Sequence, residues 1–111
     1  MHAILEAKDL YRRYSLNFER DLGFYLMNGL VIARPDRFMM AKPIVADIGD
    51  ECWNPISPDC WYVHCAVGKG AVSWFLSQAP FRLPKIAFRR FKDGHNKMKI
   101  YNTDTFERLA S

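Results

Sequence analysis

Residues 60–79 read CWYVHCAVGKGAVSWFLSQA, and this segment has the clearest structural pattern in the chain of 111 residues. Residues 60–67 are rich in aromatic and β-branched side chains, which favours a strand whose side chains alternate between two faces. Gly68-Lys69-Gly70 then predicts a turn, and residues 71–79 predict a helix of about two to three turns that ends before Pro80. A strand, a glycine turn and a helix in this order indicate a domain that combines helices with a sheet.

The residues before this segment predict a helical region followed by a β-hairpin. Apolar side chains in residues 4–22 recur at spacings of three and four, which is the pattern of a helix with one buried stripe. A break is expected near Ser15, and Gly23 or Gly29 is expected to end the region. Short apolar runs on either side of Arg34-Pro35-Asp36-Arg37 predict the hairpin, because proline followed by aspartate favours a turn. Residues 45–60 predict a long loop. The apolar stripe predicted for the helical region at residues 4–22 consists of Ile4, Ala7, Tyr11, Tyr14 and Phe18.

The residues after Pro80 predict two further strands. Residues 85–91 and 97–101 have strand composition and are separated by a loop that contains Asp93-Gly94. Asp104 with Glu107 three residues later resembles a capping box, which predicts a last helical turn. Together these elements predict a single compact α+β domain over residues 1–111, with a mixed sheet of about five strands, an N-terminal helix and one central helix.

The composition excludes several classes of protein. Hydrophobic residues make up 50% and aromatic residues 14% of the chain, which is too many for a disordered protein. No apolar run approaches the roughly 18 residues of a membrane span, so no membrane association is expected. No secretory signal is visible, and the three cysteines are an odd number. A reducing, cytoplasmic location is therefore expected.

The net charge of +4 is unevenly distributed along the chain. Residues 45–60 contain four acidic and no basic side chains, whereas residues 81–111 contain eight basic and three acidic ones. This polarity is compatible with an anionic partner. The alternative is that the two segments face each other in the fold or lie on two separate solvated faces.

The glycine turn is the segment with the most specific chemistry. A strand that ends in Gly68-Lys69-Gly70-Ala71 and opens a helix directs several backbone N–H groups outward, which suits a phosphate or pyrophosphate. Lys69 would add a positive charge. The alternative is an ordinary strand-to-helix turn that uses glycine for its backbone conformation.

This segment resembles the acyl-CoA site of GNAT-type N-acyltransferases, in which a glycine loop of pattern Arg/Gln-x-x-Gly-x-Gly/Ala joins a strand to a helix. The matching window is residues 65–70, where both glycines fit and Cys65 stands in place of Arg or Gln. The resemblance implies a GNAT-like fold with acetyl-CoA or another acyl-CoA bound at Gly68, Lys69, Gly70 and Ala71. A hairpin stands where the family has a further helix, which puts catalysis in doubt. The chain as a whole is also similar to small phage-encoded proteins.

The C-terminal segment suggests a second binding surface. Aromatic side chains alternate there with basic ones, and such a surface can stack bases and hold phosphates. The alternative is a solvated basic face. The basic residues proposed for this contact with nucleic acid or another anion are Arg82, Arg89, Arg90, Lys97 and Lys99.

Other reactive side chains do not form a recognisable site. Cys52, Cys60, His64 and Cys65 suit zinc by type but contain no Cys-x-x-Cys pair, so no metal is expected. Cys60 and His64 share a strand face but stand roughly 13 Å apart, which is too far for a nucleophile and its base. Trp53, in the acidic loop, is either a contact residue for a protein partner or a lid over the core.

The sequence therefore predicts a small cytosolic, non-catalytic binding or protein-interaction module that needs no cofactor. Its partner would be another protein or a second copy of the chain. The first alternative is a GNAT-like acyl-CoA-binding protein or N-acyltransferase, active or degenerate. The second alternative is a nucleic-acid-binding module that uses the basic C-terminal hairpin.

Overall fold

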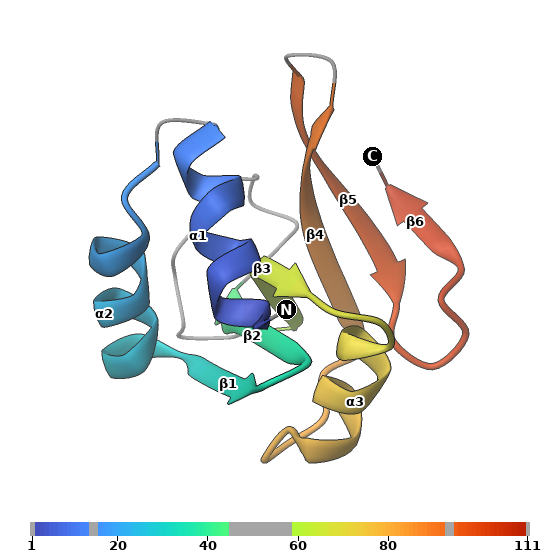
Figure 1. Cartoon of the computed structure of the whole chain (residues 1–111). Coiled ribbons are helices and arrows are strands. Elements are labelled where there is room, and N and C mark those ends of the chain that lie inside the picture. The colour runs from blue at the N-terminus through green and yellow to red at the C-terminus, as the bar shows by residue number, and fades with distance from the viewer. Residues whose placement is uncertain (1, 14–15, 45–58, 93–94, 111) are drawn as a thin grey trace. The chain divides into compact units, whose positions relative to one another are not determined.

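The structure is a computed structural model that describes residues 2–13, 16–44, 59–92 and 95–110, with the backbone alone at residues 89–92, 95–98 and 108–110. These described residues form three helices and six strands, which Figure 1 shows in chain order. The elements are α1 (Ala3–Arg13), α2 (Phe18–Asn28), β1 (Leu30–Arg34), β2 (Arg37–Ile44), β3 (Cys60–Val67), α3 (Ala71–Gln78), β4 (Lys85–Lys92), β5 (His95–Asn102) and β6 (Arg108–Ala110).

The strands form one mixed sheet in the order β1-β2-β3-β4-β5-β6. The pair β3–β4 is parallel, whereas β1–β2, β4–β5 and β5–β6 are antiparallel. The predicted α+β class and mixed sheet are thereby confirmed. The chain divides into two compact units, one made of Met1–Lys42 with Cys65–Pro80 and the other of Pro43–His64 with Phe81–Ser111. The single domain over residues 1–111 stays a prediction.

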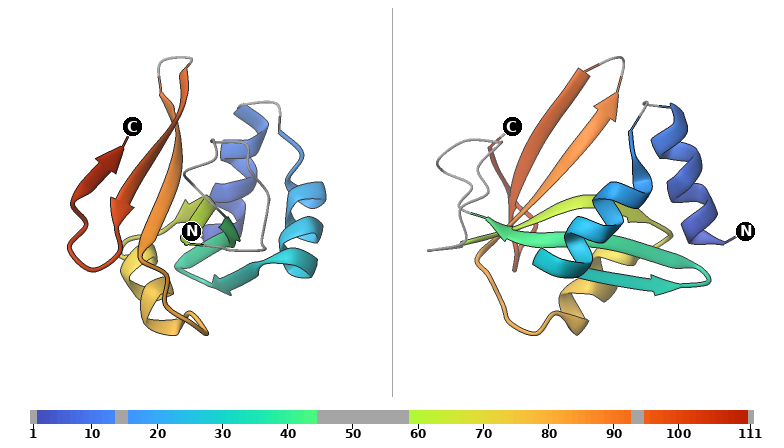
Figure 2. Two further views of the ribbon diagram at one scale, coloured as in Figure 1. Left: turned by 180° about the vertical axis from the view of Figure 1, so that it is seen from behind. Right: turned by 90° about the vertical axis from the view of Figure 1, so that its left-hand side faces the viewer.

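The first unit begins with two helices that pack side by side (Figure 2). α1 buries Ala7 and Tyr11, as the apolar stripe predicts. α2 begins after Asn17, whose side-chain oxygen accepts a hydrogen bond from the Arg20 N–H at 2.9 Å. The Phe18 ring then meets the Tyr11 ring edge-on, with 5.3 Å between the centroids. Aromatic packing therefore fixes the second helix against the first.

The helical region ends at Gly29, and Gly23 lies inside α2. The Gly29 N–H donates to the Tyr25 carbonyl oxygen at 2.9 Å. A Cβ at this position would collide with the Ala41 carbonyl oxygen of β2, so only glycine lets the two backbones approach. Of the two expected stop positions, the structure thus uses the one that faces a neighbouring strand.

The β1–β2 hairpin has the predicted turn at Pro35-Asp36 and a register from Leu30↔Ala41 to Arg34↔Arg37. All five residues from Phe38 to Lys42 are buried. Because successive strand residues point to opposite faces, β2 is covered on both faces. β1 lies at the edge of the sheet, and its residues are half-buried or exposed.

The second unit is built on β4 and β5, which pair from Lys85↔Asn102 to Lys92↔His95. Both strands are longer than the sequence pattern predicts, and the Asp93-Gly94 turn lies outside the described residues. The parallel partner of β4 is β3, in the register Cys60↔Lys85 to Val63↔Phe88.

The predicted helical turn at Asp104 is wrong, because the chain turns there and continues as β6. The Asn102 side-chain oxygen accepts hydrogen bonds from the N–H groups of Asp104 and Thr105, at 2.8 and 3.1 Å. The Asn102 N–H then donates to the Glu107 carbonyl oxygen at 2.8 Å. An asparagine just before the predicted cap therefore folds the chain back onto β5.

Candidate functional site

The Gly68-Lys69-Gly70 loop joins β3 to α3, as predicted, and both glycines have positive φ angles. Gly68 has φ +105°, and a Cβ there would collide with the Asp36 carbonyl oxygen in the β1–β2 turn. Gly70 has φ +69° with nothing close to the position of a Cβ. The first glycine is therefore required by packing and backbone conformation, and the second by backbone conformation alone.

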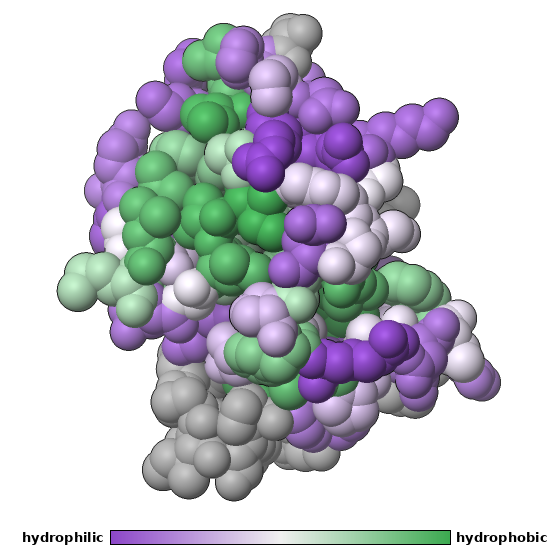
Figure 3. Space-filling model, turned by 90° about the horizontal axis from the view of Figure 1, so that it is seen from below, coloured by the Kyte–Doolittle hydropathy of each residue, from purple (hydrophilic) through white to green (hydrophobic). Residues whose placement is uncertain are grey.

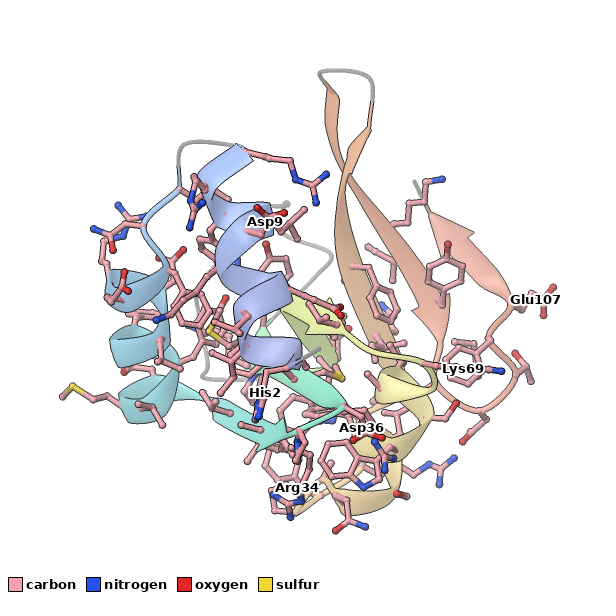
Figure 4. All side chains as sticks on the ribbon, viewed as in Figure 1. His2, Asp9, Arg34, Asp36, Lys69 and Glu107 are labelled. Carbon is pink, nitrogen blue, oxygen red and sulfur yellow. The ribbon has the colours of Figure 1, made fainter. Side chains whose placement is uncertain are left out.

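The backbone N–H groups at the start of α3 are partly used inside the loop. The Ala71 N–H donates to the Gly68 carbonyl oxygen at 3.3 Å, whereas the bond from the Trp74 N–H to the Gly70 carbonyl oxygen, at 3.0 Å, is the first regular bond of the helix. Lys69 is exposed, and its side chain extends away from Arg34 in Figure 4. The turn alone therefore explains both glycines, and of the N–H groups proposed for an anion, that of Ala71 already has an acceptor within the loop.

The structure brings a different set of charged residues together beside this loop. The guanidinium carbons of Arg37 and Arg34 lie 4.6 and 5.5 Å from the ring centroid of Trp74. Arg34 and Arg37 face each other across the hairpin, and Figure 4 labels Arg34 and Asp36 at this turn. Trp74 is half-buried. We call Arg34, Arg37 and Trp74 the arginine–tryptophan cluster.

One part of the arginine–tryptophan cluster is indicated by the sequence itself. Arg34 and Arg37 flank the predicted Pro35-Asp36 turn, so a two-residue turn places them opposite each other. What sequence reasoning lacks is the position of α3, which supplies the Trp74 ring.

Of the five proposed C-terminal contact residues, the structure describes the side chains of Arg82 and Lys99. Arg82 forms an ion pair with Asp104, and Lys99 is half-buried with Phe88 opposite it on the neighbouring strand. Arg90 is the cross-strand partner of Lys97. The side chains of Arg89, Arg90 and Lys97 lie outside the described part of the structure.

The cysteines and the histidine do not assemble into a reactive centre within the described residues. Burial raises the pKa of the Cys65 thiol to about 12, so this side chain is a neutral thiol at physiological pH. The His64 Nδ1 atom lies 3.4 Å from the Tyr62 hydroxyl oxygen. Across the described ranges, no three side chains of His, Cys, Asp or Glu are placed to hold a metal ion. Cys52 and Trp53 fall outside the described residues.

α2 exposes an apolar surface that the sequence-based interpretation did not propose. Phe24, Leu26 and Met27 are 41%, 64% and 87% exposed. Figure 3, which views the molecule from below, shows apolar side chains gathered over the α2 and β1 side of this face. The Lys42 ammonium lies 5.0 Å from the centroid of the Phe24 ring and so holds one member of the surface in place. We call Phe24, Leu26 and Met27 the α2 patch.

A sequence signal for the α2 patch does exist. Residues 24–27 are four large apolar side chains in succession, Phe-Tyr-Leu-Met. Successive helix residues are about 100° apart, so one side of a helix cannot bury them all. Tyr25 is the member that packs inward, and the other three face outward.

Within the described residues, no helix has the length and apolar character needed to cross a membrane. Comparison of the chain with protein-family models, with curated proteins and with solved structures found no match.

Proposed function

We propose that this chain is a small, non-catalytic protein-interaction module, and that the α2 patch is its contact surface. The observation that carries the proposal is the exposure of three large apolar side chains within four residues of one helix. Single exposed apolar residues are common on soluble proteins, whereas a contiguous group is typical of an interaction site. Leucine, methionine and phenylalanine also supply the apolar centre that protein interfaces need.

The partner that fits this surface is a second copy of the chain. β1 follows α2 after Gly29 alone and lies at the edge of the sheet. Alternate residues of an edge strand direct their N–H and C=O groups away from the sheet, ready to pair with another strand. In the described part of the chain, the backbone ladder of β1 is made with β2 alone.

One symmetry operation would cover both features. Antiparallel pairing of β1 with β1 of a second copy extends the sheet around a two-fold axis. α2 packs against β1, so the two copies of α2 would approach each other beside that axis. The apolar side chains and the strand edge are then buried in the same interface, which is self-complementary as a two-fold contact requires.

Sedimentation velocity over a range of protein concentrations tests this proposal. The wild-type chain is expected to move from monomer to dimer as the concentration rises. Met27→Glu and Leu26→Glu should each raise the dissociation constant about tenfold or more, because they place an unpaired carboxylate in an apolar contact. Leu5→Glu is the matched control, since Leu5 is a 59% exposed leucine on α1.

Two results would contradict the proposal. One is a wild-type chain that remains monomeric at every concentration up to the submillimolar range. The other is an equal loss of association in Leu5→Glu, which would indicate a general effect of added negative charge. Melting curves of all variants establish that each one is folded before its association is measured.

The remaining expectations from the sequence stay proposals with their own tests. A cytoplasmic location is supported by Cys60 and Cys65, which are both buried thiols outside any disulfide. The acyl-CoA alternative is supported by the open space around Gly70, and it predicts that acetyl-CoA raises the melting temperature. Gly70→Glu should abolish that rise, and the absence of any shift at millimolar acetyl-CoA would reject the alternative.

A further inference from the structure

The arginine–tryptophan cluster holds two like charges where a sheet would ordinarily avoid them. Arg34 and Arg37 are direct cross-strand partners at the closed end of the β1–β2 hairpin. Like charges in this relation destabilise a strand pair unless something between or beside them is attractive. The electron-rich face of Trp74 is such a partner for both guanidinium groups, at 5.5 and 4.6 Å. α3 therefore fixes two cations side by side at the surface of the first unit.

A cation–π contact leaves a guanidinium able to bind something else. The group carries several N–H donors in its own plane, and the ring accepts none of them as an ordinary hydrogen bond. Among the described residues, Arg34 donates one hydrogen bond, to the neighbouring Ala33 carbonyl oxygen at 2.9 Å. Arg37 likewise donates one, from Nε to Asp36 Oδ1 at a long 3.4 Å. Most of the donors of both side chains are therefore available to a ligand.

The charge at the turn is only partly balanced. Asp36 is the one carboxylate paired with either arginine in the described ranges, and its side chain is mainly exposed. Two guanidinium groups against one exposed carboxylate leave an excess of positive charge. Paired planar forks of this kind match the oxygen atoms of a phosphate group, which can accept two hydrogen bonds from each.

The turn that carries the two arginines is also held in place by contacts with the β3–α3 loop and with the start of α1. Gly68 of the β3–α3 loop packs against Asp36 and Arg37, and a Cβ on Gly68 would lie 3.0 Å from the Arg37 Cα atom. The Ala3 N–H donates to the Pro35 carbonyl oxygen at 3.0 Å from the other side of the same turn. The cations are thus positioned before any ligand arrives, which lowers the entropic cost of binding.

We propose that the arginine–tryptophan cluster is a binding site for a phosphoryl group, either free as phosphate or pyrophosphate or carried by a nucleotide. The site is formed by side chains of the hairpin turn and α3, and it does not depend on the backbone N–H groups of Gly70 and Ala71. It is also independent of the α2 patch, so a chain that stays monomeric can still bind the ligand.

Isothermal titration of the full chain with pyrophosphate at low ionic strength tests the proposal. Arg34→Gln and Arg37→Gln should each weaken binding about fivefold, because each removes one charge contact with the phosphoryl group. Asp36→Asn should tighten binding severalfold, because it removes the anion that competes for Arg37. This gain separates a binding site from a purely structural stack, since a structural role gives no reason for tighter binding.

Two controls distinguish binding at the cluster from binding elsewhere on the chain. The double variant Arg12→Gln/Arg13→Gln removes two exposed arginines from α1 and should leave pyrophosphate binding unchanged. Gly70→Asn introduces a residue that tolerates a positive φ angle, and it should also leave pyrophosphate binding unchanged. Unchanged binding in this variant distinguishes the arginine–tryptophan cluster from a site at the glycine loop. ATP should compete with pyrophosphate, whereas adenosine should not, and the relative affinities of ATP and pyrophosphate identify the source of the phosphoryl group.

Several results would overturn the inference. No heat of binding at millimolar pyrophosphate excludes the site. Equal weakening by the α1 control would mean that the chain attracts anions only through its net charge. An Asp36→Asn variant that binds no more tightly than wild type, or adenosine that competes as well as ATP, would each contradict recognition of a phosphoryl group by these arginines.

Discussion

Replacing Gly68 with alanine should destabilise the chain far more than replacing Gly70, although both glycines belong to the same loop. At Gly70 the added Cβ meets nothing, so Gly70→Ala incurs only the conformational cost of φ +69°, about 1 kcal/mol. At Gly68 the backbone has φ +105°, and the Cβ would also collide with the main-chain oxygen of Asp36. The hairpin turn must then move, which adds about 1–3 kcal/mol.

Gly68→Ala should therefore lower the free energy of unfolding by about 3 kcal/mol, compared with about 1 kcal/mol for Gly70→Ala. Urea denaturation followed by far-UV circular dichroism measures both values in one assay. An unfolded Gly68→Ala beside a folded Gly70→Ala would be the extreme form of the expected result. Two variants whose stabilities agree within about 0.5 kcal/mol would refute the packing role of Gly68.

Three further predictions concern charge. The Cys65 thiol has its ordinary pKa of 9.0 in the unfolded chain, whereas burial raises its pKa to about 12 in the folded chain. Above pH 9.0 only the unfolded chain loses this proton, so the free energy of unfolding should fall by up to about 1.4 kcal/mol per pH unit. Urea titrations should show a shallower fall for Cys65→Ala, and a flat wild-type profile would contradict the burial of this thiol. Asp59→Asn removes the half-buried carboxylate that lies 3.0 Å from the Lys85 ammonium, and it should lower the free energy of unfolding by about 1 kcal/mol. The difference in stability between this variant and the wild-type chain should become smaller at high salt. If the C-terminal hairpin binds single-stranded nucleic acid, Arg89→Glu with Arg90→Glu should abolish a salt-sensitive affinity, and unchanged binding in a filter assay would reject this function.

Local sequence patterns predicted the elements that depend on neighbouring residues. The strand at Cys60–Val67 and the helix that follows Gly70 appear where composition and glycine place them. The β1–β2 turn also lies at Pro35-Asp36, as the turn chemistry indicates. These elements are set by propensity, alternation and turn residues, which act over a few positions.

Features that depend on contacts distant in sequence could not be predicted in the same way. The choice of Gly29 over Gly23 as the end of α2 follows from the approach of β2 at Ala41. The chain after Asn102 forms a turn and a strand because β5 offers an edge to pair with, whereas the Asp104–Glu107 pattern indicates a helix. In both places the partner lies on another strand, and the local pattern contains no information about that strand.

The same distinction applies to the candidate sites. Two glycines beside a helix suit an anion, yet Gly68 is explained by the carbonyl oxygen of Asp36. The cluster beside it joins Arg34 and Arg37 to Trp74, which stands far along the chain from both. Segment-by-segment reasoning can find a turn, but it cannot find a ring contributed by a later helix.

Charge counted along the sequence is a poor guide to where an anion would bind. In the C-terminal segment, Arg82 pairs with Asp104, and Lys85 pairs with Asp59 of the acidic segment. Part of the excess positive charge of the C-terminal segment is therefore neutralised within the second unit. Asp59, which belongs to the acidic segment at residues 45–60, contributes one of the two carboxylates. Residues 1–44 have a smaller excess, with seven basic and five acidic side chains, but Arg34 has no carboxylate partner among the described residues. Because a bound phosphate needs donors that are not already committed to a carboxylate, we place the proposed anion site at the hairpin turn, where Arg34 meets this requirement.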